Sequence, residues 1–183
     1  LRPSAIFNST EQDSVLVLGD YLLENNHQLI QMLVKVSPLL PDSIRFIFKP
    51  HPACPIPPNI LKGVHAFVSE EALENLLQNC TIAFSSNVTT ASLDAYFRGV
   101  PVACMIDPKK LNLSPMLEID DSVFVKTHQD LAIKILQSLE REDNRERYPS
   151  NFFELDTSLS KWLRFIQKTL SIADHHKKEN DSK

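Results

Sequence analysis

The stretch Thr81–Asp107 constrains the fold most, because its pattern indicates strand, turn, helix, turn and strand in close succession. A short apolar run, Thr81–Phe84, is followed by three small polar residues at Ser85–Asn87. Apolar residues then recur at helical spacing over Thr89–Phe97, and a second apolar run follows at Val102–Ile106. This succession predicts a βαβ unit whose polar turn lies at the carboxyl end of a strand, where open α/β sheets bind ligands.

The polar turn brings hydroxyl groups to the expected start of a helix, where backbone N–H groups bind phosphate readily. Ser85, Ser86 and Thr89 are therefore candidate phosphate contacts. The same residue types commonly cap helices, so the pattern leaves a purely structural role open. Arg98-Gly99 has the composition of a helix end, with a basic last turn and a glycine after it.

Strands alternate with helices through most of the chain. This alternation predicts a Rossmann-like three-layer α/β sandwich with a parallel sheet of about six strands. The other strands are expected at Ser14–Leu18, Ser43–Phe48, Val64–Val68 and Ser122–Val125. The other helices are expected at Glu24–Val36, Ser69–Gln78, Gln129–Leu139 and Ser158–Ile172, with Ser69 and Thr127 as caps.

The sequence divides into four expected segments. Residues 1–13 form an irregular lead-in, and residues 14–140 form the Rossmann-like domain. Residues 141–173 form a charged linker and an amphipathic helix, which Trp162 is expected to anchor to the body of the protein. Residues 174–183 are expected to be a disordered tail. The sequence starts at Leu1 without a methionine, so we expect a fragment of a longer chain.

Composition excludes several functional classes. The net charge of −4 gives no general case for binding nucleic acid or an anionic membrane. Only three glycines occur, so dinucleotide and P-loop motifs are absent. The histidines lack metal-ligand spacing, and we expect neither a metal nor a cofactor. Cys54, Cys80 and Cys104 form no CxxC pair, which favours free thiols in a reducing compartment.

No apolar run approaches the roughly 20 residues of a membrane span, and no signal peptide is visible. These features predict a cytoplasmic protein without a transmembrane segment. Peripheral attachment at the inner face of the membrane stays open.

A second candidate site is Lys49-Pro50-His51-Pro52, which directly follows the strand expected at Ser43–Phe48. The two prolines restrict the backbone on either side of His51 and so hold its imidazole in one direction. Lys49 and His51 can both donate to an anion when protonated. Because parallel strands end at one edge of a sheet, we expect this segment to lie near Ser85 and Ser86. A rigid loop with a surface histidine is the alternative.

Three short motifs together resemble a known family. The KPHP segment at Lys49–Pro52, the serine pair Ser85-Ser86 and the RGVPV segment at Arg98–Val102 are similar to motifs in the carboxyl-terminal domain of GT-B glycosyltransferases. The closest resemblance is to bacterial sialyltransferases and to capsule or lipopolysaccharide transferases with HP and SS motifs. It covers roughly residues 14–139. It implies one half of a GT-B fold, which binds the nucleotide of a CMP-activated sugar such as CMP-sialic acid.

The resemblance also implies roles for individual residues. His51 would contact the CMP phosphate and stabilise it as the leaving group, which makes His51 the candidate catalytic residue. The remaining candidate nucleotide contacts are Lys49, Pro52, Ser85, Ser86, Asn87 and Thr89. A carboxylate would take the ribose hydroxyls, and the candidates are Glu70, Glu71 and Asp94. Ordinary helix-start or surface charge is the alternative for each of these carboxylates.

The family's general base lies in an amino-terminal domain that this sequence lacks, so the fragment is not expected to complete the reaction alone. The implied partners are a CMP-sugar donor, a carbohydrate acceptor in surface polysaccharide or lipopolysaccharide synthesis, and that missing domain. The alternatives are a domain like a nucleotide-sugar epimerase, a CDP-polyol phosphotransferase domain, or a non-catalytic nucleotide- or phosphosugar-binding module.

Overall fold

The computed structural model describes residues 13–61, 63–109, 111–117, 119, 121–140 and 158–180. The chain forms two compact units, Leu1–Pro149 and Ser150–Lys183, which we describe separately. The expected lead-in falls almost entirely on residues 1–12, and the expected charged linker on residues 141–157. Both of these segments lie outside the described residues.

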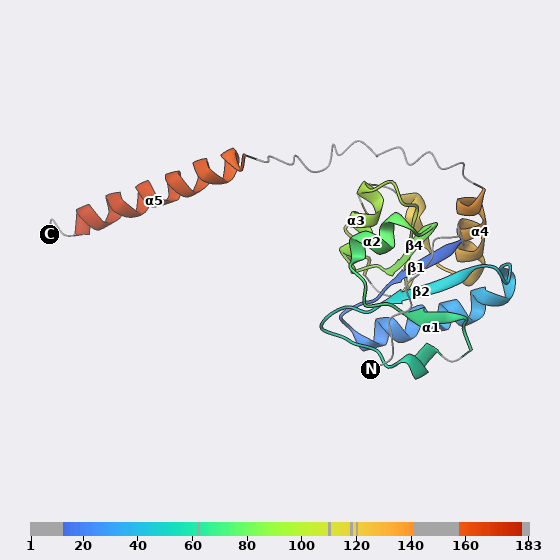
Figure 1. The fold of residues 1–183 in the computed structure, drawn as a ribbon. Coiled ribbons are helices and arrows are strands. Elements are labelled where there is room, and N and C mark those ends of the chain that lie inside the picture. The colour runs from blue at the N-terminus through green and yellow to red at the C-terminus, as the bar shows by residue number, and fades with distance from the viewer. Residues whose placement is uncertain are drawn as a thin grey trace. The chain divides into compact units, whose positions relative to one another are not determined.

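The first unit contains a parallel sheet with strand order β3-β2-β1-β4-β5-β6 (Figure 1). The strands are β1 (Ser14–Leu18), β2 (Arg45–Lys49), β3 (Ala66–Val68), β4 (Ile82–Ser86), β5 (Val102–Met105) and β6 (Phe124–Val125). This sheet confirms the predicted Rossmann-like α/β class. The chain adds β2 and β3 on one side of β1 and then places β4 on its other side. The topological switch point, where ligands bind such sheets, therefore lies between β1 and β4.

Helices cover both faces of the sheet, as Figure 1 shows. They are α1 (Leu23–Val36), α2 (Leu73–Gln78), α3 (Ala91–Phe97) and α4 (His128–Leu139), with short 3₁₀ turns η1 (Ser37–Leu39), η2 (Pro58–Leu61) and η3 (Asp121–Val123). Helices α1 and α4 pack with Val15 and Val17 in one core cluster. Helices α2 and α3 pack with Leu16 and Leu18 in the other. Alternating residues of β1 thus enter both cores, which explains its unbroken apolar sequence.

Several element boundaries differ from the prediction, and two of them involve candidate site or capping residues. Strand β4 extends through Ser86 instead of ending at Phe84, because Ser85 and Ser86 pair with Cys104 and Met105 of β5. The predicted cap at Ser69 is wrong, since α2 begins at Leu73 after Ala72 and has no side-chain cap. The Ser69 hydroxyl accepts a hydrogen bond from the Glu71 backbone instead.

The ends of α3 and α4 test the other predicted caps. Thr90 precedes α3 with helical backbone angles and makes no side-chain capping bond, so capping by Ser85, Ser86 or Thr89 is not observed. Gly99 follows α3 with a positive φ of 74°, which confirms the predicted helix end. Thr127 caps α4, also as predicted, and the structure adds a reciprocal capping box with Asp130. Hydrogen bonding by Thr127 holds the pKa of Asp130 below its ordinary value.

The second unit contains one helix, α5 (Ser160–Asn180). It is longer than the sequence pattern indicated. Residues 174–180, expected in a disordered tail, are helical, and residues 181–183 lie outside the described residues. Within α5, the rings of Trp162 and Phe165 meet edge to face at a centroid distance of 6.1 Å. Anchoring of this helix by Trp162 stays a prediction. Among the described residues, no helix is long and apolar enough to cross a membrane.

Candidate functional site

The strand register brings the two sequence motifs to one edge of the sheet. Leu18, the last residue of β1, pairs with Lys49 of β2 on one side and with Ser85 of β4 on the other. The KPHP segment and the residues after Ser86 therefore leave the sheet on either side of β1. This confirms the predicted common edge, and the edge coincides with the topological switch point.

Gly19 holds the end of β1 against the KPHP segment. Its backbone N–H donates to the Lys49 carbonyl over 2.8 Å. A Cβ atom at this position would lie 2.9 Å from the Lys49 carbonyl oxygen and 3.0 Å from the His51 nitrogen. Both are backbone atoms that cannot move independently of the chain. Only glycine therefore allows this approach without displacing the loop that carries His51.

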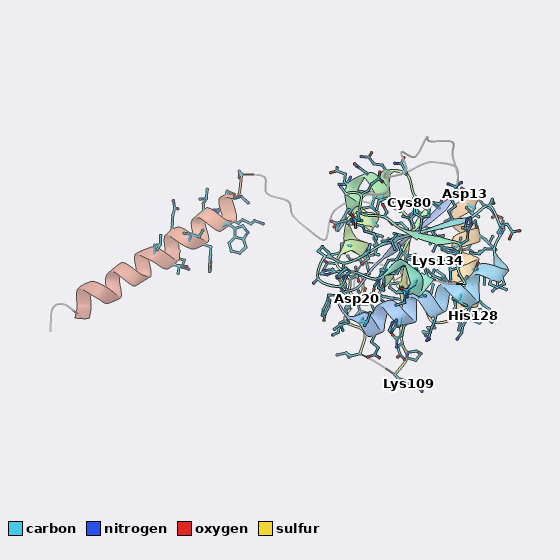
Figure 2. All side chains as sticks on the ribbon, turned by 60° about the horizontal axis from the view of Figure 1, so that its bottom comes forward. Asp13, Asp20, Cys80, Lys109, His128 and Lys134 are labelled. Atoms are coloured by element: carbon cyan, nitrogen blue, oxygen red, sulfur yellow. The ribbon has the colours of Figure 1, made fainter. Side chains whose placement is uncertain are left out.

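Asp20 follows Gly19 and is the hydrogen-bonding centre of this edge. Its side chain is 1% exposed, which is unusual for a carboxylate. One oxygen accepts from the Leu22 backbone over 2.8 Å. The other accepts from Asn25 Nδ2 over 3.0 Å and from the Ser86 hydroxyl. Figure 2 places Asp20 at the opposite end of the domain from Asp13 and Cys80. These contacts compensate the cost of burying the carboxylate and connect β1 to β4.

Asn26, in the first turn of α1, fixes the backbone of Asp20 from the other side. Its fully buried side chain accepts from the Asp20 N–H over 2.7 Å and donates to the Asp20 carbonyl over 2.8 Å. The same Nδ2 group lies 3.4 Å from Cys54 Sγ, in the loop that follows His51. Asp20 and Asn26 thus join the strand ends of β1, β2 and β4 into one hydrogen-bonded group.

The contacts of His51 define which of its ring nitrogens can act on a ligand. Nδ1 accepts a hydrogen bond from the Ala53 backbone over 3.1 Å, so the neutral ring carries its proton on Nε2. The ring is half-buried and meets Tyr21 edge to face at 6.2 Å. No described residue accepts from Nε2. The sequence suggested a donor that acts when protonated, whereas this geometry already provides a donor in the neutral ring.

Ser86 and Thr89 belong to the Asp20 network. The Ser86 hydroxyl uses its one hydrogen to donate to Asp20, and its oxygen lies 3.0 Å from Thr89 Oγ1. Thr89 must therefore be the donor in that pair. Asn87, between them, donates from Nδ2 to the Leu111 carbonyl over 3.2 Å and so ties the β4 end to the loop after β5.

Ser85 points to the opposite face of β4. It is fully buried, and its hydroxyl lies 3.4 Å from Cys104 Sγ. Burial raises the pKa of the Cys104 thiol, so this pair stays neutral inside the core. Ser85 was expected to hold a phosphate together with Ser86. Because alternate residues of a strand face opposite sides, the structure does not bring the two hydroxyls together, and we assign Ser85 no ligand contact.

The other candidates from the sequence lie around this centre. Lys49 is half-buried at the end of β2, and Pro52 is exposed. Glu70 and Glu71 are exposed just after β3, two strands away from β1, and Asp94 is exposed on α3. No described contact joins these three carboxylates to His51 or Ser86. The structure also groups no three His, Cys, Asp or Glu side chains as a metal site within its described part.

A separate cavity of about 330 Å³ lies at the opposite edge of the sheet. It is lined by Ser37, Leu40, Pro41, Asp42, Ile44, Phe46 and His65. These residues surround the end of α1 and the starts of β2 and β3, where a parallel sheet seldom binds its ligand.

Comparison with known proteins identifies glycosyltransferases as structural neighbours. The chain is similar to the catalytic domain of cholesterol-alpha-glucosyltransferase from Helicobacter pylori, with a TM-score of 0.54 and 25% identity over 74% of this chain and 91% of that one. It is also similar in fold to the glycotransferase of kitacinnamycin, with a TM-score of 0.50 and 14% identity over 80% of this chain and 40% of that one. No protein-family model and no curated protein sequence matches. The fold is therefore glycosyltransferase-like.

Sequence reasoning missed Asp20 and Asn26. An acidic residue after a strand is common, and the partner Ser86 lies 66 residues further along the chain. The available signal was the order of elements. A Gly-Asp pair ends the first buried strand, and two asparagines follow in the next helical turn. Short polar side chains at such a position favour local hydrogen bonds to the backbone.

Proposed function

We propose that this chain is the donor-binding domain of a glycosyltransferase that uses a CMP-activated sugar, with CMP-sialic acid as the first candidate. The main support for this proposal is one observation. The Gly19–Tyr21 segment joins the KPHP loop to the end of β4 at the topological switch point. The two structural neighbours named above, which are glycosyltransferases, support the same class of reaction. Cytidine as the base rests on the resemblance of the HP and SS motifs.

In this proposal His51 donates from Nε2 to the phosphate of the nucleotide. Negative charge grows on that phosphate as the bond to the sugar breaks, so a fixed donor stabilises the transition state more than the bound donor substrate. Lys49 contributes positive charge at the same edge. No metal is needed where these two groups neutralise the leaving CMP.

Asp20 acts as a positioning residue. It accepts a hydrogen bond from the Ser86 hydroxyl, and through Asn26 it holds the loop after His51 in position next to β4. Ser86 and Thr89 then border the site with their relative orientation fixed. One of Glu70, Glu71 and Asp94 takes the ribose hydroxyls, since all three are exposed and the GT-B resemblance implies a carboxylate in this role.

The rest of the reaction belongs to other parts of the enzyme. By the GT-B resemblance, an amino-terminal domain supplies the general base and the acceptor site. The acceptor is a carbohydrate of surface polysaccharide or lipopolysaccharide synthesis. A donor that carries glucose is the second candidate, because the first structural neighbour is a glucosyltransferase.

Calorimetric titration of the full chain with CMP, CDP, UMP and UDP tests the proposal. We expect CMP to bind most tightly. His51→Ala should weaken CMP binding by about 1.5–3 kcal/mol, the usual value of a hydrogen bond to a charged group. His65→Ala is the matched control, because His65 is exposed at the opposite edge of the sheet. Tighter binding of UDP than of CMP would overturn the cytidine assignment. Unchanged CMP binding by His51→Ala would remove the main support for the transferase site.

A further inference from the structure

Over residues 162–170, helix α5 has a mainly apolar side, with Thr169 as its one polar member. Trp162, Phe165, Ile166 and Leu170 recur at spacings of three and four residues, and Leu163 extends the same side. At 3.6 residues per turn these side chains cover an arc of about 160°. All are large, and their exposed fractions range from 48% for Ile166 to 63% for Trp162. A helix with such a side gains free energy by placing it in an apolar environment.

The charged residues in the first part of α5, Ser160–Ala173, also lie on one side. No Asp or Glu occurs from Ser158 to Ala173, whereas Lys161, Arg164 and Lys168 recur at spacings of three and four residues. These three basic side chains fall within an arc of about 60°, next to the Phe165 border of the apolar side. The whole chain carries a net charge of −4, so this basic segment is a local exception.

We propose that α5 binds the surface of an anionic lipid bilayer, lying in the plane of the membrane. A helix with a broad apolar side and adjacent basic residues has the composition of an interfacial membrane helix. Trp and Phe bury their rings at the boundary between headgroups and acyl chains, and Lys and Arg bind the anionic headgroups. One bilayer thus provides an apolar environment for the apolar side chains of α5 and anionic groups for its basic side chains.

Other partners satisfy only part of this pattern. A nucleic acid would pair with the basic residues but leave the large apolar side chains in water. A second copy of α5 would cover the apolar side but bring two sets of basic residues together, which is unfavourable. The proposal rests on α5 alone and holds whether or not the chain is a transferase.

The only tryptophan of the chain, Trp162, reports directly on this helix. The full chain is titrated with vesicles of phosphatidylcholine and phosphatidylglycerol at 3:1, and with vesicles of phosphatidylcholine alone. We expect the Trp162 emission to move to shorter wavelength with the anionic vesicles and the protein to float with them. Salt should weaken this binding, because it screens the headgroup charge.

Matched variants distinguish the effect of the basic residues of α5 from the effect of the net charge of the whole chain. Lys161→Gln, Arg164→Gln and Lys168→Gln together should weaken binding to the anionic vesicles on the order of 100-fold, at roughly fivefold for each residue. The control replaces three exposed lysines of the first unit, Lys35, Lys109 and Lys126, with Gln and changes the net charge equally. It should bind like the parent. Ile166→Ser with Leu170→Ser keeps Trp162 and should also abolish the spectral shift.

Four results would overturn the proposal. The first is the absence of any spectral shift with anionic vesicles, and the second is equal binding to neutral vesicles. The third is short-wavelength emission without lipid that depends on protein concentration, which would indicate a second copy. The fourth is such emission at every concentration without lipid, which would indicate that α5 docks on its own chain.

Discussion

The contact between Asp20 and Ser86 predicts a measurable coupling between two residues that are 66 positions apart. In Asp20→Asn, the amide oxygen can still accept from the Leu22 backbone. The amide NH₂ group, however, replaces the oxygen that accepts from Asn25 and Ser86. The Asn25 amide would then face another donor, and the Ser86 hydroxyl would have to turn its hydrogen toward Thr89 to accept from the new amide, at a residue that is 1% exposed in the parent. The hydrogen bond from Asn25 to the carboxylate is lost, and the charge-assisted one from Ser86 is replaced by a weaker neutral one. The half-buried Asn25 can recover part of its loss in water.

We therefore expect Asp20→Asn to lower the free energy of unfolding by about 2–3 kcal/mol, and Ser86→Ala by about 1–2 kcal/mol. The decrease in the free energy of unfolding for the double variant should be smaller than the sum of the two single decreases by at least about 1 kcal/mol. The reason is that both substitutions remove the same bond between the Asp20 carboxylate and Ser86. In thermal melting, about 2 kcal/mol corresponds to a decrease of roughly 6–10 °C for a unit of this size.

Urea unfolding followed by circular dichroism measures all four proteins under identical conditions. Asn25→Ala is the control, because it removes a different partner of Asp20 and leaves the bond to Ser86 intact. If the losses from Asp20→Asn and Ser86→Ala add within about 0.3–0.5 kcal/mol, the two residues do not interact and the network does not connect the strand ends.

Three further predictions follow from separate contacts. Gly19→Ala should destabilise the fold by about 1–3 kcal/mol and weaken CMP binding, because the alanine Cβ would press on the backbone of the KPHP loop. Thermal melting tests the loss of stability, and calorimetric titration of the same preparation tests the loss of CMP affinity. Asp130 has a lowered pKa in the folded state, so its stabilising effect is present above its ordinary pKa of 3.8 and is lost as the pH falls through the lowered value. The stability difference between the parent and Asp130→Asn should thus disappear in acid, and a difference that persists there would exclude the capping box as its source. A thiol reagent should label the half-exposed Cys54 quickly. Cys104 should react only on unfolding, because it is buried and the pKa of its thiol is raised. Fast labelling of Cys104 in the folded protein would contradict the packing of β5.

The fold could be predicted because its central strands are continuous apolar runs. Strand β1 buries all five of its residues between two helical layers, and after Ser14 its sequence is apolar throughout. The end of β4 was misjudged for the opposite reason. Ser85 and Ser86 are polar and suggested a turn, but their backbones complete the ladder with β5, and their hydroxyls find partners in Cys104 and Asp20. Polarity alone could not distinguish a turn from the buried end of a strand.

The candidate site could be predicted only in part. The common edge of Lys49 and Ser85 follows from parallel topology and needed no side-chain detail. The role of Asp20 depends on a contact with a distant strand, and the tautomer of His51 depends on the turn that brings the Ala53 N–H to its ring. Such long-range and geometric facts leave no periodic pattern in a sequence.

The most direct test of the central claim is to locate bound CMP on the ¹⁵N-labelled full chain by backbone amide shifts. We expect the largest shifts in three segments that meet at the switch point: Gly19–Tyr21, His51–Cys54 and Ser86–Thr89. The His51→Ala variant should lose most of these shifts at the same CMP concentration, whereas His65→Ala should retain them. Shifts that cluster instead around the cavity near His65, or no shifts at saturating CMP, would contradict the proposed donor site.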